Sequence, residues 1–395
     1  MNKCKLGDLF YIKQGYAFKS EKYVSHSNYI LCTLANFSES NNFKFSPEKA
    51  TYYPDEFSHE FILCENDLII PLTEQVVGLF GNTAFVPKTE GFQFVLNQRV
   101  GKIIPYEEKA DKLFLHYLLS TQLVRDQIEA TASGTKQRNT SPDKIYDVTV
   151  WVPNIDQQRI IGRYLYSLEQ KCNVNNKICS ELETMAKTLY DYWFVQFDFP
   201  DENGKPYRTS GGEMEWNEQL KRKIPKGWGV TNIGNLTTVV TGKEDANFSS
   251  PNGKYKFFTC SQEALLCDTP AFSGQAVLIA GNGDFNVKHY SGEFNAYQRT
   301  YVLIPENQVY YGAMYISAKN QIQAFKNGSN GSIVKFITKG DVENIPFILP
   351  NNDLIFHQIN KLIEKIELCE RENEELTKLR DWLLPMLMNG QARVE

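Results

Sequence analysis

The sequence has 395 residues, of which 42% are hydrophobic, 23% charged and 13% aromatic. This length predicts two or more domains, and this composition excludes a disordered chain, a collagen and a small disulfide scaffold. The 42 basic and 47 acidic residues give a net charge of -5, so only a local basic surface could bind DNA. No stretch approaches the ~18 to 20 apolar residues of a membrane span, and the start has no signal-like apolar run. We therefore expect a cytoplasmic protein.

The two halves of the chain resemble each other at an offset of about 200 residues, which predicts an internal duplication. LGDLF at 6–10 matches IGNLT at 233–237, and QRVGKIIP at 98–105 matches QRTYVLIP at 298–305. In each half a Gly-Ser/Thr loop then leads to a proline, Pro153 or Pro350, and a long helical pattern follows. The four matches occur in the same order, and this order favours duplication over chance.

The two helical patterns carry apolar residues at alternating steps of four and three, the spacing of a coiled-coil seam. The first seam is Ile161, Leu165, Leu168, Cys172, Asn175, Cys179, Leu182, Ala186, Leu189 and Trp193. The second is Leu362, Ile366, Cys369, Asn373, Leu376, Leu383 and Leu387, with Arg380 or its neighbour Leu379 at the one irregular step. A lone helix of this kind usually packs on its own domain, but two in one chain favour mutual pairing. Asn175 and Asn373 fall near the seam centres, where they would either fix the register or lie exposed at a loose seam.

The remaining sequence predicts mixed domains, because short β-type runs alternate with glycine, asparagine and proline, and a helical pattern covers 112–128. The predicted fold class is α+β: two mixed α/β domains related by internal duplication and separated by two long helices that pair as an antiparallel coiled coil. The predicted boundaries are 1–150 for the first domain, 151–198 for the first helical region, 199–227 for a linker, 228–350 for the second domain and 351–395 for the second helical region.

The sequence lacks the usual signatures of an enzyme acting on nucleotides or nucleic acid. There is no phosphate-binding GxxxxGK[ST] loop, no GxGxxG after a strand, and no Pro-Pro of an adenine methyltransferase motif. The eight cysteines and five histidines show no zinc or triad spacing, so we expect no metal, no cofactor and no catalytic residue. A nuclease-like pattern can be assembled only loosely from Pro142, Asp143, Glu169 and Lys171, the last two on the expected coiled coil.

Two loops at equivalent places of the halves are rich in basic and small polar residues. No acidic residue occurs from 130 to 142 or from 307 to 340. Such loops suit phosphates and base edges, although each loop alone could be an ordinary solvated turn. Polar residues near the start of each half could line the same face. The candidate DNA-binding residues are Lys13, Gln14, Tyr16, Lys19, Ser133, Thr135, Lys136, Gln137, Arg138, Thr241, Lys243, Lys326, Asn330, Ser332 and Lys335.

The whole chain resembles the specificity subunit of type I restriction-modification enzymes. The resemblance depends on the duplicated order of domain then helix and on four strings: VWVPNIDQQRIIGRYLYSLEQK, ILPNNDLIFHQINKLIEKIE, LYDYWFVQF and IPKGWGVTNIGNLTTVVTGK. It implies a non-catalytic subunit in which each target-recognition domain reads one half of a split double-stranded DNA site. Helices of 32 to 38 residues would be about 50 to 55 Å long, so the coiled coil would set the unread spacer.

The resemblance also implies protein partners. Two adenine methyltransferase subunits would dock along the helical regions and supply the base-flipping pocket, and motor-nuclease subunits would join for cleavage. The aromatic cluster Tyr190, Tyr192, Trp193 and Phe194 could serve this docking or could pack at the junction of helix and domain. Two other functions stay open from the residues alone: a self-contained DNA-modifying enzyme and a coiled-coil scaffold that binds only proteins.

Overall fold

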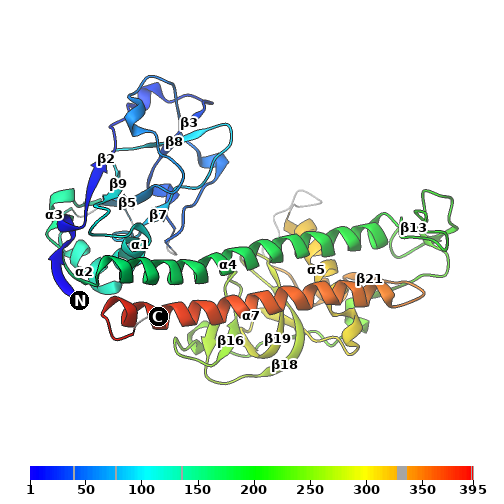
Figure 1. Cartoon of the computed structure of the whole chain (residues 1–395). Helices are drawn as coiled ribbons and strands as arrows, with labels where there is room; N and C mark the ends of the chain where they lie inside the picture. Colours follow the sequence, from blue (N-terminus) through cyan, green and yellow to red (C-terminus); the bar gives the residue numbers. More distant parts are fainter. Residues whose placement is uncertain (39–40, 76–77, 135–136, 327–335, 393, 395) are drawn as a thin grey trace. The chain divides into compact units, whose positions relative to one another are not determined.

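The protein is described by a computed structural model that covers residues 1–395 except 39–40, 76–77, 135–136, 327–335, 393 and 395. The chain forms two compact units, the first of residues 1–172 and 374–395 and the second of residues 173–373. Two long helices, α4 (Ile155–Tyr190) and α7 (Leu354–Met388), each contribute one segment to each unit (Figure 1).

The first unit contains two small sheets. One has the strand order β2 (Phe10–Gln14), β9 (Val100–Pro105), β5 (Leu68–Pro71), β7 (Ala84–Phe85), and the other β4 (Tyr52–Tyr53), β3 (Tyr29–Cys32), β8 (Gln93–Leu96). Two short pairs are β1 (Asn2–Lys5) with β11 (Thr149–Val152) and β6 (Thr73–Glu74) with β10 (Arg138–Asn139). The helices are α1 (Lys112–Ser120), α2 (Gln122–Ala130) and α3 (Pro142–Tyr146). β3 and β8 are parallel, whereas the other pairs are antiparallel.

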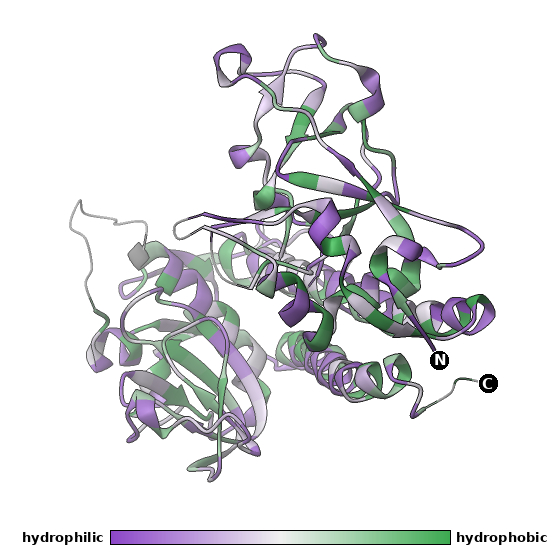
Figure 2. Cartoon of the chain, turned by 90° about the vertical axis from the view of Figure 1, so that its left-hand side faces the viewer, coloured by the Kyte–Doolittle hydropathy of each residue, from purple (hydrophilic) through white to green (hydrophobic). Residues whose placement is uncertain are grey.

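The second unit contains one larger sheet. Its strand order is β15 (Val240–Thr241), β20 (Thr300–Leu303), β18 (Phe272–Ala280), β19 (Val287–Ala296), β16 (Tyr255–Phe258), β17 (Leu265–Cys267). The short pairs are β14 (Gly229–Asn232) with β21 (Pro346–Leu349) and β12 (Met214–Asn217) with β13 (Arg222–Pro225), and the helices are α5 (Tyr311–Lys326) and α6 (Lys339–Glu343). The inner strands of both units are hydrophobic, as expected for strands buried between helices and loops (Figure 2).

The two globular regions share one topology, which confirms the predicted duplication. In the first region β2, β9 and β5 are neighbours in that order, and in the second β15, β20 and β18 repeat it. The parallel pair β3 and β8 corresponds to the parallel pair β16 and β19. The first strand of each region pairs with the last one, β1 with β11 and β14 with β21. The residue after each first strand then donates to the residue just before the last strand: Leu6 N to Val148 O and Ile233 N to Ile345 O, both at 2.9 Å.

The two long helices pack antiparallel, as the heptad spacing predicts. In the first unit Ile161 and Leu165 of α4 share a core with Leu387 of α7, and in the second unit Ala186 of α4 shares a core with Ile363 of α7. The early part of one helix therefore meets the late part of the other within each unit. The seam residues at regular steps are all buried or half-buried, since burying the apolar stripe is the main gain from pairing. At the irregular step Arg380 is half-buried and Leu379 is exposed, so Arg380 is the residue on the seam.

A buried tyrosine–glutamate hydrogen bond ties each globular region to a long helix. Tyr117 on α1 donates to Glu169 on α4 at 2.7 Å, and Tyr311 on α5 donates to Glu367 on α7 at 2.5 Å. Burial raises the pKa of both phenols and also that of the Glu169 carboxyl. The phenols therefore remain hydrogen-bond donors over the physiological pH range.

Candidate nucleic-acid interface

Three loop segments that are far apart in the sequence meet at one edge of the first globular region. They are residues 15–19 after β2, the turn 97–100 that leads from β8 into β9, and the described residues 133–134 and 137–140 at β10; we call them the first loop cluster. Gln98 N donates to Tyr16 O at 2.9 Å, which joins the first two segments. Leu72 N donates to Arg99 O at 2.9 Å and Thr140 N donates to Leu72 O at 3.0 Å, which brings in the third.

The second globular region repeats this arrangement. Residues 241–244 after β15, the turn 297–300 between β19 and β20, and residues 336–338 before α6 form the second loop cluster. Gln298 N donates to Glu244 O at 2.9 Å. Gly281 N donates to Arg299 O at 2.9 Å, and Ile337 N donates to Gly281 O at 2.8 Å. The same chain of backbone hydrogen bonds therefore assembles an equivalent edge in each unit.

A glycine lets two segments approach closely in each loop cluster. Gly15 N donates to Val100 O, and Gly242 N donates to Thr300 O, both at 3.2 Å. A Cβ at Gly15 would overlap the carbonyl group of Asn97, and one at Gly242 would overlap that of Ala296. A side chain at either position would therefore push the segments apart, which is why the sequence needs glycine there.

The sequence-predicted residues of the first half lie in or next to the first loop cluster. Gln14, Tyr16, Lys19 and Ser133 are exposed, and Gln137 is half-buried. Tyr16 packs its ring edge against Phe18 at 5.1 Å between ring centroids. Thr135 and Lys136 lie outside the described residues.

Two of the predicted cations already have carboxylate partners. Lys13 Nζ is 3.1 Å from the Glu60 carboxylate, and this contact lowers the pKa of that carboxyl. Arg138 Nη1 lies 2.9 Å from Glu74, which is 1% exposed, and 2.7 Å from Glu129. The hydrogen bond that the Arg138 guanidinium donates to the Glu129 carboxylate raises the pKa of Arg138. These contacts hold the loop in shape and reduce the positive charge that either side chain offers to DNA.

Only some of the candidate residues of the second half lie within the described ranges. Thr241 and Lys243 are exposed in the second loop cluster, and Lys326 is the last residue of α5. Asn330, Ser332 and Lys335 lie outside the described residues. The DNA-contact role of every residue in this set stays a prediction.

The repeated Gln-Arg pair marks the duplication in the sequence, but its position in a turn at the edge of each sheet appears only in the structure. Gln98–Arg99 and Gln298–Arg299 are the two central residues of equivalent β-turns, closed by Val100 N to Asn97 O at 2.9 Å and Thr300 N to Tyr297 O at 2.8 Å. Within the described part of the chain, none of these four side chains forms a hydrogen bond or ion pair. The repetition of QR at the start of a strand was the signal that could have identified them.

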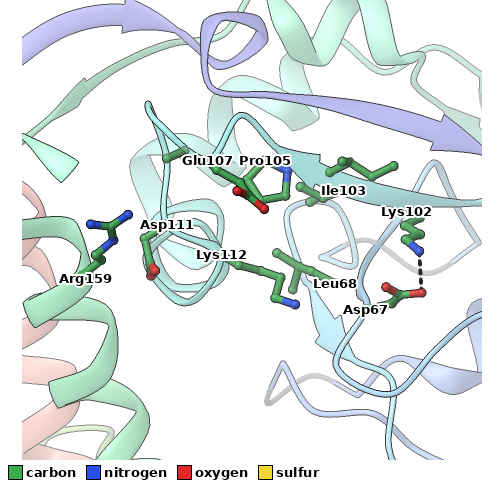
Figure 3. Close-up of a pocket in the computed structure, with 11 residues that line it drawn as sticks. Asp67, Leu68, Lys102, Ile103, Pro105, Glu107, Asp111, Lys112 and Arg159 are labelled. Atoms are coloured by element: carbon green, nitrogen blue, oxygen red, sulfur yellow. Dashed lines mark ion pairs between the residues drawn. The ribbon is translucent and has the colours of Figure 1, made fainter. Parts of the chain in front are cut away.

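A cavity of about 400 Å³ lies elsewhere in the first unit, on the side of the sheet that faces α1 and α4 (Figure 3). Its lining carries three basic residues, Lys102, Lys112 and Arg159, and three acidic residues, Asp67, Glu107 and Asp111. Lys102 pairs with Asp67 at 2.7 Å, and the Asp111 carboxylate accepts the Phe114 amide at the start of α1. Because these charges balance, the cavity does not concentrate the positive potential that DNA binding requires.

The aromatic cluster at the end of α4 is mostly part of a core. Tyr190 and Phe194 are buried, and the Phe194 ring stacks on Phe356 of α7 at 5.6 Å between centroids. Trp193 stacks on Phe199 at 4.8 Å and, like Tyr192, is half-buried. The buried pair packs at the junction of helix and domain, and the partner-binding role of the cluster stays a prediction.

The described ranges contain neither a metal-binding group nor a membrane-spanning helix. There, no group of three or more His, Cys, Asp or Glu side chains is placed to hold a metal ion. No helix in the part of the chain that the structure describes combines the length and apolar character needed to cross a bilayer. Glu169, which belongs to the nuclease-like sequence pattern, is engaged by Tyr117.

The fold defines a class of protein in which two duplicated α/β domains are joined by a pair of antiparallel helices. The family described as "Type I restriction modification DNA specificity domain" matches residues 1–184 and 225–378. The chain therefore belongs to the family of type I restriction-modification specificity subunits, the non-catalytic subunits that recognise DNA for these systems.

Individual relatives agree with this assignment. The chain is 35% identical to the type I restriction enzyme EcoDI specificity subunit of Escherichia coli over 180 residues, which cover 44% of this chain and 40% of that relative. It is 22% identical to the MjaIX specificity subunit of Methanocaldococcus jannaschii over 76% of this chain and 73% of the relative. The crystal structure of the S subunit from M. genitalium superposes with a TM-score of 0.61 at 16% identity, covering 98% of this chain and 96% of that one. This last similarity is one of fold.

Proposed function

We propose that this chain selects the DNA sites on which a type I restriction-modification complex acts. Residues 1–150 and 228–350 each form a target-recognition domain that reads one half of a bipartite double-stranded site. The observation that carries the proposal is the presence, in each unit, of a loop cluster assembled by the same backbone hydrogen bonds. A matched pair of exposed polar edges suits two half-sites of one duplex.

Different residues of the loop clusters would have different tasks. Lys19, Lys136 and Lys243 would contact phosphates, because a lysine ammonium binds an anion without demanding a fixed geometry. Gln14 and Gln137 would read base edges, since an amide pairs with adenine through two hydrogen bonds. Arg138 would hold its loop in place through Glu74 and Glu129.

The helical regions, 151–198 and 351–395, would set the length of the unread spacer and dock the partners. Specificity subunits act with DNA, methyltransferase subunits and restriction subunits; we propose two adenine methyltransferase subunits here, in the cytoplasm. Val174, Ile178 and Met185 support docking along α4. They are 39% to 56% exposed and lie on one helix face because they are spaced by four and seven residues. An exposed apolar stripe on a charged helix is a typical protein-binding face.

The test is methylome sequencing of cells that express this chain with its methyltransferase subunit. We expect a single bipartite motif with adenine methylation in both halves. Methylation that is scattered, or that follows a single uninterrupted motif, would refute the proposal that each of the two domains reads one half-site. A chain with residues 1–150 exchanged for another recognition domain should change only one half of the motif, and a change in both halves would contradict independent reading.

The spacer role has its own test. Deleting one heptad from each long helix, at positions facing each other in the pair, should shorten the unread gap of the methylated motif. The matched control removes the same number of residues from the linker 199–227. An unchanged gap in the heptad variant, with methylation intact, would assign the spacer to another feature.

A further inference from the structure

We infer that the Gln-Arg turns, Gln98–Arg99 and Gln298–Arg299, are a shared phosphate anchor that fixes each recognition domain on the DNA backbone without reading sequence. The inference builds on the proposed function and assigns a task to residues that it leaves unused. It concerns both loop clusters equally, because the two turns have the same place in the topology of their domains.

The placement of each turn favours contact with a large anionic partner. Each turn is hydrogen-bonded on one side to the segment after β2 or β15 and on the other side to Leu72 or Gly281. Gln98, Gln298 and Arg299 are exposed and Arg99 is half-buried. In the described residues neither guanidinium has a carboxylate partner, in contrast to Arg138, so each keeps its full charge for a ligand.

The turns are also held in a fixed position. Arg99 O and Arg299 O accept hydrogen bonds from the Leu72 and Gly281 amides, and the preceding glutamine amides donate to the segments after β2 and β15. The backbone on both sides is therefore immobilised before DNA arrives. Pre-positioning reduces the entropy lost on binding, which suits an anchor that must set the register of the whole domain.

Both domains carry the same Gln-Arg pair, and this sameness favours contact with phosphates over reading of bases. The loop sequences at equivalent places of the two halves differ: residues 133–139 read SGTKQRN and residues 327–335 read NGSNGSIVK. Domains that read different half-sites must differ in the residues that touch bases. A pair that stays the same suits the partner that both half-sites share, the phosphodiester backbone, to which arginine and glutamine both donate.

The test uses the chain assembled with its methyltransferase subunits and measures binding to a duplex that carries the methylated motif and to one that lacks it. Arg99→Ala and Arg299→Ala should each weaken binding to both duplexes by the same factor. One lost phosphate contact corresponds to about five-fold at 0.15 M salt and to a fall of about 0.9 in the slope of log K against log salt. The methylated motif should not change. Arg99→Lys should restore most of the slope, which separates a lost contact from a misfolded domain.

The controls are Lys88→Ala and Lys254→Ala, which remove the same charge from exposed residues. Lys88 precedes the start of β8, whereas the Gln98–Arg99 turn follows the end of β8. Lys254 precedes the start of β16, whereas the Gln298–Arg299 turn follows the end of β19, the strand parallel to β16. Each control therefore lies at the opposite end of the strands from the turn. Weaker binding to the motif duplex alone, or a relaxed methylated motif, would overturn the inference in favour of base reading. Unchanged binding by both arginine variants would also overturn it. If the unsubstituted assembly does not prefer its motif, the proposed function itself fails.

Discussion

The side-chain amide of Asn175 on α4 donates a hydrogen bond of 2.9 Å to the side-chain oxygen of Asn373 on α7. Asn175 is 1% exposed and also donates to Glu372 at 2.7 Å, while Asn373 donates to Asn176 at 2.8 Å. The two seam asparagines that the heptad spacing singles out are therefore paired and not left at a loose seam. A buried polar pair lowers the stability of a coiled coil but penalises every other register, in which it would lack a partner.

This pair predicts different effects for single and double substitutions. Asn175→Leu should destabilise the second unit by about 1–3 kcal/mol, because Glu372 and Asn373 each lose the hydrogen bond that the buried Asn175 amide donates. Asn175→Leu with Asn373→Leu should recover most of that loss, since an apolar pair suits the seam. Thermal unfolding measures both, with exposed Thr188→Leu as the control. A double variant less stable than the single one would contradict this account of the pair.

The register of the helix pair predicts one specific cross-link. Burial raises the pKa of Cys179 on α4 to about 11, and the neighbouring Cys369 thiol of α7 adds to the rise. Because the two thiols are neighbours, oxidised glutathione added as the two-electron oxidant should join Cys179 to Cys369, with reduced glutathione released, and peptide mapping should find that disulfide. The rate should increase between pH 7 and pH 9, because the attacking species is the thiolate. Cys369→Ser is the control that should abolish the product, and a dominant cross-link from Cys179 to another cysteine would refute the register.

His116 predicts a loss of stability in acid. The residue is 2% exposed, its Nδ1 lies 2.7 Å from Thr83 Oγ1, and burial lowers its pKa to about 4, with Arg380 contributing. As the pH falls from about 6.5 to about 4, the unfolded chain gains a proton that the folded one does not, so stability falls by about 3 kcal/mol. His116→Gln should lack this component of the pH dependence in chemical unfolding. The exposed His59→Gln is the control, and identical pH profiles for both variants would rule out the assignment.

We expect Arg138 to contribute to the stability of the first unit and not to DNA affinity. Arg138→Ala leaves the buried Glu74 carboxylate without its nearest cation, so we expect a lower unfolding temperature of the first unit. Adding Glu74→Gln should restore part of the loss, because the unpaired charge is gone. The slope of DNA affinity against salt should stay close to that of the unsubstituted chain, since two carboxylates already neutralise the guanidinium. A slope lowered by about 0.9 with unchanged stability would make Arg138 a phosphate contact instead.

The sequence by itself determined the helical seams, the duplication and the α+β class. A heptad is a local pattern, so Leu165 and Ile366 could be assigned to a buried seam without knowledge of any distant contact. The order of repeated strings likewise needs no three-dimensional information. The same reasoning predicted that Asn175 and Asn373 fall at matching places, because their positions follow from counting along each helix.

Only the tertiary structure decided which polar residues share an edge and which cations keep a free charge. Arg138 and Glu74 are distant in the sequence and meet because β10 pairs with β6. The Gln98–Arg99 turn lies beside Tyr16 and Leu72 through hydrogen bonds between separate strands. Strand pairing joins segments whose partners no local pattern specifies, so the composition of a loop predicts its chemistry but not its neighbours.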